Sequence, residues 1–254
     1  MTRQFALGAA TSLFVATLVA PGSSAAAVAG ASAADPAYGA PTVGECFDPS
    51  RGELDAHSHV ESPVSCASPN TSEVVAVATL PESVGHDARP GKLKRIALEA
   101  CLPALEERVG TSDGQLGHTA YLLGYFFPTE EQRAAGARWL RCDVVLQGGK
   151  RLLPLPARLE VGEFPFPPRV AKCLAGKPLL PTACSEPHTY RARNVLESAS
   201  ESAPYPSRVQ RKEDGRALCR FVLDTRSPFR FTWSDRASWA TGDRELTCYS
   251  HTRR

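Results

Sequence analysis

The spacing of apolar residues identifies the main elements in the first half of the chain. The segment 73–79 is apolar and β-branched over the length of a strand, and this composition predicts a mostly buried strand. Apolar residues then recur at helical spacing over 93–109, with Cys101 on the apolar face, which predicts an amphipathic helix that ends at Gly110. Pro103 inside that segment predicts a kink or a division into two shorter helices.

The following segments predict two strands separated by a short helical turn. Residues 121–127 are aromatic and apolar, residues 128–131 place acidic residues after a proline as in the first turn of a helix, and residues 138–146 predict a strand that carries Cys142. With a first strand near residues 43–47, the order is strand, strand, helix, strand, short helix, strand. This order is typical of an α+β fold in which one helix packs across a small antiparallel sheet.

An internal repeat divides the chain into two modules. The sequence from Phe127 to Cys142 recurs from Trp233 to Cys248 without a gap, with an aromatic residue, a glycine and an arginine at matching distances before the cysteine. A repeat of this kind is usually one structural unit. We therefore predict two small disulfide-stapled modules, over residues 43–146 and 171–250. The segment 147–170, rich in proline and glycine, is interpreted as a stiff linker or a crossing segment between them.

The first residues of the chain predict export. Arg3 precedes an apolar run over 5–20, and residues 31–33 have the A-x-A form of a cleavage site. Residues 1–33 are therefore interpreted as a secretory signal peptide, with a retained membrane anchor as the alternative. Residues 34–42 are interpreted as a flexible leader. No later stretch is long and apolar enough to span a bilayer, so we expect no stable membrane span after cleavage.

The charge of the exported chain is close to balanced. Without residues 1–33 it has 28 Lys and Arg against 27 Asp and Glu, a net charge of +1. This balance argues against the binding of nucleic acid or anionic lipid by bulk charge. The basic run 208–212 is therefore interpreted as a solvated face rather than as a phosphate site.

The cysteines predict four disulfide bonds. Eight cysteines, an even number, are expected to be oxidised in an exported chain. The gap between the second and third cysteine is 35 residues in both modules, whereas the other gaps differ. The equal gap favours a bridge between these two cysteines, although four cysteines allow three pairings in each module. The favoured pairs are Cys66–Cys101, Cys46–Cys142, Cys184–Cys219 and Cys173–Cys248.

These residues together resemble the septum formation domain family. The family frame contains G-D-C-F, V-P-C-x-x-P-H-x-x-E-V, a cysteine within a helix, and P-x-x-x-x-W-x-x-G-D-R-x-x-x-C. The chain resembles two tandem copies of this frame, of which the second is more divergent, and the similar segments are 44–47, 64–75, 128–142, 184–188 and 239–248. The first copy departs from the frame where Asn70 replaces the histidine and Ala137 replaces the aspartate.

The resemblance implies a location and a process rather than a reaction. Members of the family are exported or membrane-anchored extracytoplasmic proteins of actinobacteria. A link to cell division is implied by the name of the family, and no catalytic activity is implied.

Three motifs could carry chemistry, and each has a simpler interpretation. Residues 110–114 fit G-x-S-x-G, but they follow a helix instead of a strand, so a helix cap and turn is favoured over a nucleophile elbow. His57 and His59 could bind a metal, but no third ligand stands at metal-site spacing, so a solvated loop is favoured. Cys184 and His188 could pair a thiol with an imidazole, but an oxidised cysteine is no nucleophile.

A candidate binding corner lies in the second module. It combines a histidine, an aromatic residue and two charged residues, namely His188, Trp239, Asp243 and Arg244. Arg244, and Arg138 at the matching position of the first module, could hold an anion or form a structural ion pair.

We expect an exported, non-enzymatic protein of the cell envelope with a binding or structural role linked to septum formation. No cofactor and no metal is expected, and the expected partner is an envelope or divisome protein. One alternative is a secreted cell-wall hydrolase, which would need a cleft with converging titratable groups. Another is an extracytoplasmic domain that senses a ligand.

Overall fold

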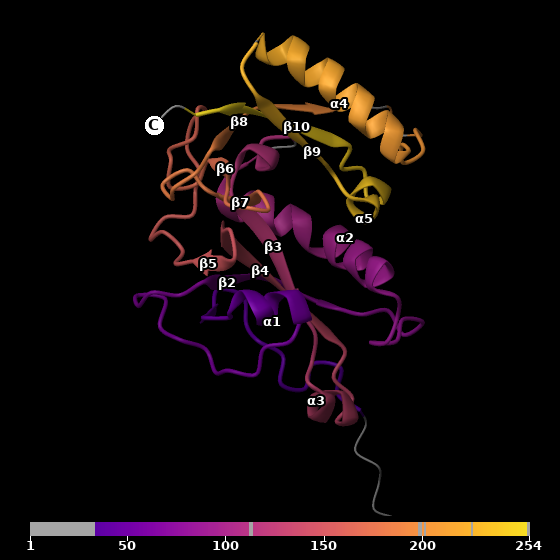
Figure 1. Cartoon of the computed structure of the whole chain (residues 1–254). Coiled ribbons are helices and arrows are strands. Elements are labelled where there is room, and N and C mark those ends of the chain that lie inside the picture. Colours follow the sequence, from indigo (N-terminus) through magenta and orange to yellow (C-terminus); the bar gives the residue numbers. More distant parts are fainter. Residues whose placement is uncertain (1–33, 112–113, 198–199, 201, 225, 253–254) are drawn as a thin grey trace, which may run out of the picture. The chain divides into compact units, whose positions relative to one another are not determined.

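The computed structural model describes residues 34–111, 114–197, 200, 202–224 and 226–252, and all strand pairs within them are antiparallel (Figure 1). The predicted α+β fold is therefore confirmed. The helices are α1 Arg51–Ala56, α2 Pro90–Val109, the short 3-10 helix η1 Leu116–His118, α3 Glu130–Ala134, α4 Arg208–Leu223 and α5 Arg236–Ala240. The strands are β1 Cys46–Phe47, β2 Ser72–Thr79, β3 Tyr121–Phe126, β4 Trp139–Gly148, β5 Arg151–Leu153, β6 Lys172–Ala175, β7 Leu180–Ala183, β8 Tyr190–Glu197, β9 Phe229–Trp233 and β10 Glu245–His251.

Two sequence predictions fall outside this part of the chain. The predicted signal peptide, residues 1–33, is one, and the central residues of the G-x-S-x-G motif, 112–113, are the other. Among the described residues, no helix combines the length and the apolar character that crossing a membrane requires.

The first half of the fold is a four-stranded unit with one helix across it. Its strands lie in the order β1, β2, β4, β3. One face of α2 packs on them through residues four apart, which share a face of a helix and are fully buried: Ala97, Cys101, Leu105 and Val109. α2 runs unbroken through Pro103, so the prediction of two shorter helices was wrong. Pro103 faces solvent, while the buried residues before and after it anchor the helix.

The second half has the same topology. Its strands lie in the order β6, β8, β10, β9, and α4 packs across them as α2 packs in the first half (Figure 1). A β-bulge also recurs in both halves. Val75 of β2 has no partner residue in β4, and Arg193 of β8 has no partner residue in β10. Each bulge lies beside a cysteine of the partner strand, Cys142 or Cys248. Bulges bend a strand locally, so β2 and β8 bend at corresponding places.

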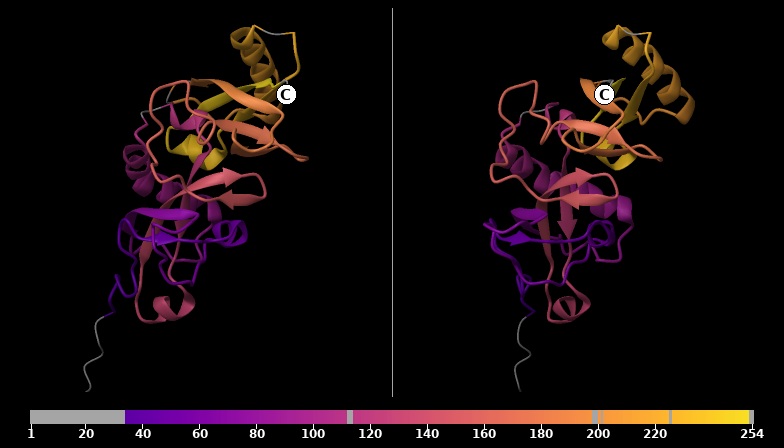
Figure 2. Two further views of the ribbon diagram at one scale, coloured as in Figure 1. Left: turned by 90° about the vertical axis from the view of Figure 1, so that its left-hand side faces the viewer. Right: turned by 60° about the vertical axis from the view of Figure 1, so that its left-hand side comes forward.

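The two halves are joined in one sheet. β4 meets β7 through one residue pair, Gly148 and Thr182, which makes the continuous order β1-β2-β4-β7-β6-β8-β10-β9. The views in Figure 2 show the strands of both halves and the helices beside them.

The segment between the halves belongs to the core. Leu159, Val161, Phe166 and Val170 are all buried in the main apolar cluster together with α2. The backbone N–H of Val161 also donates to the carbonyl oxygen of Val109 at 2.9 Å. The interpretation of residues 147–170 as a stiff linker was therefore wrong, because apolar side chains between the prolines pack inward, and the segment crosses from one half to the other within the core.

The leader is docked rather than flexible. The indole Nε1 of Trp139 donates to the carbonyl oxygen of Tyr38 at 3.1 Å. The backbone N–H of Arg138 donates to the carbonyl oxygen of Pro36 at 2.9 Å. The prediction of a tether at residues 34–42 was therefore wrong. Small residues with little to bury are still ordered when β4 offers them a hydrogen-bonding edge.

Helix α1 was not predicted from the sequence. Ser50 caps this helix, since its Oγ accepts from the N–H of Glu53 at 3.2 Å and the Glu53 carboxylate accepts from the N–H of Ser50 at 2.8 Å. This reciprocal pair is a capping box, whose S-x-x-E signature was present in the sequence.

All eight cysteines form disulfides, but the favoured pairing was wrong. The bonds are Cys46–Cys66, Cys101–Cys142, Cys173–Cys184 and Cys219–Cys248. In each half one bond joins the helix to the strand beneath it, β4 or β10, and the other joins the first strand, β1 or β6, to the loop that precedes β2 or β8. The equal gap of 35 residues reflects the conserved length of the strand and helix between the second and third cysteine. It does not reflect a bond between them.

Removal of the helix–strand disulfide is expected to destabilise the protein strongly. The paired replacement Cys101→Ala with Cys142→Ala should lower the free energy of unfolding by about 2–5 kcal/mol, because it frees a long loop in the unfolded chain and empties a buried site. Urea unfolding followed by circular dichroism measures this. Peptide mapping under non-reducing conditions should recover Cys46 joined to Cys66, and recovery of Cys66 joined to Cys101 would contradict the pairing.

Candidate functional site

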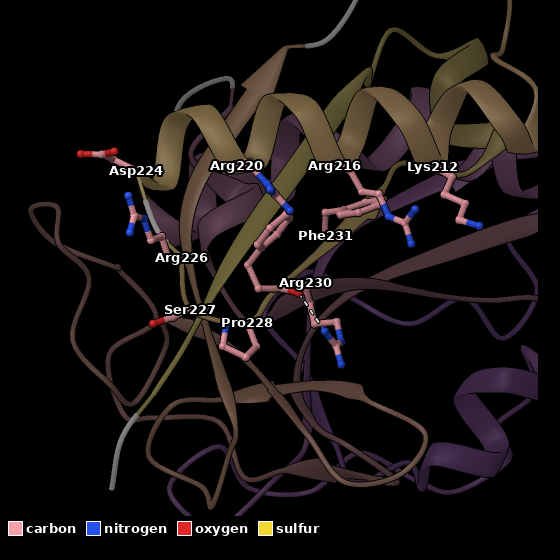
Figure 3. Close-up of a pocket in the computed structure, with 10 residues that line it drawn as sticks. Lys212, Arg216, Arg220, Asp224, Arg226, Ser227, Pro228, Arg230 and Phe231 are labelled. Carbon is pink, nitrogen blue, oxygen red and sulfur yellow. Dashed lines mark hydrogen bonds between the residues drawn. The ribbon is translucent and has the colours of Figure 1, made fainter.

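An open groove of about 1080 Å³ lies between α4 and β9 (Figure 3). Five cationic side chains line it, together with one acid and two phenylalanines. The lining residues are Lys212, Arg216, Arg220, Asp224, Arg226, Ser227, Pro228, Phe229, Arg230 and Phe231. We call this feature the basic groove.

One side of the basic groove is a row of cations on α4. Lys212, Arg216 and Arg220 are four residues apart, so they share one flank of the helix, and all three are exposed. The adjacent stripe of α4, which includes Gly215 and Cys219, is buried against the sheet. The flank is held in place because the stripe beside it is anchored, in part by the Cys219–Cys248 disulfide.

The other side of the basic groove is β9, the last strand of the sheet. It pairs with β10 alone among the described strands. Arg220 lies 5.9 Å from the ring centre of Phe229, and Arg230 donates to the carbonyl oxygen of Phe229 at 2.9 Å. Arg230 also lies 5.0 Å from the ring centre of Tyr190. The groove therefore combines cations with aromatic surface along an edge of the sheet.

The cations of the basic groove have no acidic partners. Within the part of the chain that the structure describes, none of the five forms an ion pair. Asp224 is the only carboxylate among the residues that line the groove. Clustered cations of this kind produce a positive potential that attracts anions, and guanidinium groups bind carboxylates and phosphates with paired hydrogen bonds.

The basic groove was not predicted from the sequence. A net charge of +1 averages over the chain, so it concealed a local excess of cations, and the run 208–212 was interpreted as solvated. The signal that could have found the groove is the spacing of Lys212, Arg216 and Arg220 by four residues on one helix.

The candidate binding corner is not brought together by the structure. Trp239 is buried, and its Nε1 donates to the carbonyl oxygen of Ala203 at 2.9 Å. Arg244 lies 5.6 Å from the Trp239 ring centre and donates to the carbonyl oxygen of Gly242 at 3.0 Å. These contacts fix the turn between α5 and β10. They are those of a packed structural corner.

His188 lies at the other end of β10. Thr189, next to it, receives a hydrogen bond from Thr252, whereas Arg244 precedes the first residue of that strand. The Nδ1 of His188 donates to the carbonyl oxygen of Glu186 at 2.8 Å. A histidine and two cysteine sulfurs do gather here within 4.8 Å, but Cys173 and Cys184 are bonded to each other, so neither offers a thiolate to a metal.

A buried ion pair occupies the core of the first half. Arg141 and Asp143 lie on β4 with their side chains 3% and 0% exposed, and Arg141 Nε donates to Asp143 at 3.0 Å. The Arg141 guanidinium lies between the rings of Phe47 and Phe126, at 4.0 and 4.1 Å from their centres. Both faces of the cation are covered, so this pair fixes the packing and is closed to a ligand.

The two candidate histidines are packed rather than solvated. His57 caps α1 in a left-handed conformation and stacks on Tyr125 at 3.9 Å, while His59 is buried against Phe47. The prediction of a solvated loop was therefore wrong. Burial lowers the pKa of both histidines, so both are neutral at pH 7.

A polar cluster lies between the halves. Burial raises the pKa of Glu245 on β10 to about 7, with Asp243 adding to the rise and Lys172 on β6 opposing it. Burial, and then the charge of Lys172, lowers the pKa of His118 on η1 to about 4. Gly117 brings the backbone against Glu245, because a Cβ at this position would lie 2.3 Å from its Oε2.

The stability that His118 contributes is expected to be lost as the pH falls from 6.5 to 4. The pKa of His118 is lowered on folding, so the stability that it contributes is present above about 6.5, the unfolded value, and is lost as pH falls toward 4. His118→Gln should flatten this loss in urea unfolding measured across that range. Glu245 acts in the opposite direction between 4.5 and 7, because its pKa is raised. An unchanged slope in the variant would contradict the assignment to His118.

Gly215 is expected to be needed for the close packing of α4 on β9. A Cβ at Gly215 would lie 2.4 Å from the Phe231 ring, whereas one at Gly91 in α2 would meet nothing within 4 Å. Gly215→Ala should therefore lower the melting temperature. The matched change Gly91→Ala should raise stability by up to about 1 kcal/mol, the difference in helix propensity. Stabilisation by both changes would show that α4 and β9 can separate enough to fit a methyl group without a loss of stability.

Comparison with known proteins gives one match. No curated protein and no solved structure matches the chain. A scan against protein-family models matches the family described as "Septum formation" over residues 86–248, a single span that begins before α2 and ends in β10. The match includes both helix–strand disulfides and the basic groove, and it covers more than half of the chain. The chain therefore belongs to the septum formation family.

Proposed function

We propose that this protein is a non-enzymatic, extracytoplasmic component of the cell envelope that acts in septum formation by binding a partner through the basic groove. Membership of the septum formation family supports a role related to cell division. The observation that carries the binding role is the set of five groove cations without an acidic partner.

The groove is suited to an anionic partner. Like charges on one flank of a helix repel each other, so a row of three cations is unfavourable in the free protein. An anion that enters the groove relieves this repulsion and gains hydrogen bonds from guanidinium groups. The electrostatic field also speeds the encounter with a partner of opposite charge.

The four disulfides support an extracytoplasmic location. Structural disulfides persist in oxidising compartments and are rare in the cytosol. Each half of the fold buries a helix–strand disulfide completely, with Cys101, Cys142, Cys219 and Cys248 all 0% exposed. A reducing compartment would remove these links from two small units that have modest cores.

Binding is a better fit to the groove than hydrolysis. A cell-wall hydrolase needs two carboxylates, or a nucleophile and a base, that converge on one bond. The groove offers Asp224 as its one lining carboxylate, and the half-buried Glu245 and Asp243 do not line it. A sensor of a small ligand would enclose its ligand more fully than this open groove does.

We further propose that the family domain is itself a duplicated unit. The single family match runs across both halves, and both halves have the same strand order, helix position and disulfide pattern. In this proposal the halves have diverged in role, since only the second presents an exposed cationic flank. The proposed partner is an envelope or divisome protein with an acidic surface.

Charge reversal in the groove is expected to abolish the role in division. In a deletion strain, Arg216→Glu with Arg220→Glu should fail to restore normal septa and cell length. Lys150→Glu with Arg158→Glu reverses two exposed cations outside the groove and should restore both. Microscopy of septa measures the effect, with immunoblots to match protein amounts. Full restoration by the groove variant would refute the binding role.

An assay of the purified chain on isolated cell walls tests the non-enzymatic character. No soluble fragments are expected to be released. A release that one substitution abolished would support the hydrolase alternative instead.

A further inference from the structure

Helices α2 and α4 occupy matching places in the two halves, but corresponding flanks of the two helices differ in exposure. Counted from Cys101 and Cys219, the flank of α2 that corresponds to Lys212, Arg216 and Arg220 is formed by Lys94, Leu98 and Leu102. The three residues on α2 are half-buried, whereas the three on α4 are exposed. The same flank is therefore covered in the first half of the fold and uncovered in the second.

The cover on α2 is a short helix from the other half. α5 packs against α2, and Asp235, the N-cap residue of α5, forms an ion pair with Lys94 (Figure 1). Asp235 also raises the pKa of Tyr125 on β3, second to burial. Tyr125 is the counterpart of Phe231 in the groove. The contact thus places an acidic helix start against the lysine that corresponds to Lys212.

The counterpart of α5 in the first half is α3, and it is uncovered. Both are five-residue helices between the third and fourth strand of their half, with N-cap residues Thr129 and Asp235 at matching positions. α5 buries Ser238 and Trp239, while α3 buries no residue. α3 therefore presents a free surface where α5 presents an occupied one.

The free surface of α3 is acidic at its start. Glu130 and Glu131 in its first turn are exposed, and neither forms an ion pair within the described residues. Arg133, farther along, is engaged with the carbonyl oxygen of Pro128 at 2.7 Å. Two unpaired acids on α3 thus match the unpaired cations on the flank of α4.

We propose that copies of this chain associate head to tail, with the acidic start of α3 from one copy bound in the basic groove of the next. The proposal rests on the proposed function in one respect, that the groove is a binding surface. The contact repeats between chains the one that α5 and α2 make within the chain. In the groove, Glu130 and Glu131 would face Lys212, Arg216 and Arg220.

The association is open rather than closed. α3 and α4 belong to different halves and lie at opposite ends of the view in Figure 1. A contact between two different surfaces leaves one of each free on a pair, so further copies can be added. The charged residues are exposed, so the contact should weaken as salt screens it.

Complementary charge reversals test the proposal in sedimentation velocity of the purified chain. The groove variant, Arg216→Glu with Arg220→Glu, and the helix variant, Glu130→Lys with Glu131→Lys, should each be monomeric where the wild-type chain forms concentration-dependent oligomers at low salt. A mixture of the two variants should form oligomers again, because the intact α3 of the groove variant fits the intact groove of the helix variant and the two reversed surfaces are complementary to each other. A chain with all four reversals should again form oligomers. Lys150→Glu with Arg158→Glu should behave as the wild-type chain.

Several outcomes would overturn the proposal. A monomeric wild-type chain at all concentrations would do so, as would oligomers that persist in either variant. Binding of inorganic polyphosphate or of phosphatidylglycerol vesicles to the groove, without self-association, would assign the groove to another anion. Glutamine in place of Glu130 and Glu131 controls for folding, since it removes charge without reversing it, and melting curves should match the wild type.

The two proposals fail separately. If the chain is monomeric but the groove variant still fails to restore septa, the binding role stands and the self-association is wrong. If the groove variant restores septa fully, the binding role is wrong whatever the sedimentation shows.

Discussion

The covalent link between a helix and the strand beneath it is the constraint on which the rest of the structure depends. Cys101 fixes α2 on β4, and Cys219 fixes α4 on β10, each inside an apolar cluster. A unit of four strands and one helix has little apolar surface to bury, so a buried disulfide replaces part of the core that a larger domain would have. Each helix is thereby fixed in rotation as well as position. The flank beside each buried stripe is consequently presented in one direction.

The two halves show how one framework can present different chemistry. In the first half, β4 buries Arg141 and Asp143 with the guanidinium between two phenylalanines. At the corresponding positions β10 has Thr247 and Tyr249, and the Tyr249 hydroxyl lies 3.1 Å from the hydroxyl of Thr232. A buried ion pair is tolerated only where the two charges pair closely, because taking them out of water is costly, whereas hydroxyl groups are satisfied by one another at less cost. The same two positions thus hold a charged pair in the first half and neutral hydroxyl groups in the second.

The periodic parts of the sequence predicted the fold, and the parts shaped by tertiary contacts did not. β2, α2, β3 and β4 were predicted because their apolar residues repeat with the period of a strand or a helix. The packing of segment 147–170 and of the leader was not predicted. Proline and glycine content does not show whether the residues between them pack against the rest of the fold. The disulfide pairing failed for a related reason. The equal spacing of the second and third cysteines shows only that the two halves have the same number of residues between these positions. A disulfide requires that two cysteine side chains lie next to each other in the fold.

The segment 147–170 between the halves limits where the chain can be cut into fragments. Residues 159–170 lie in the core of the first half, yet they lead directly into β6 of the second. An expression boundary placed at the proline-rich stretch would remove four buried side chains from one fragment and leave them exposed on the other. Neither fragment would contain a complete interior. The two halves share a topology, yet their interiors are continuous through this segment.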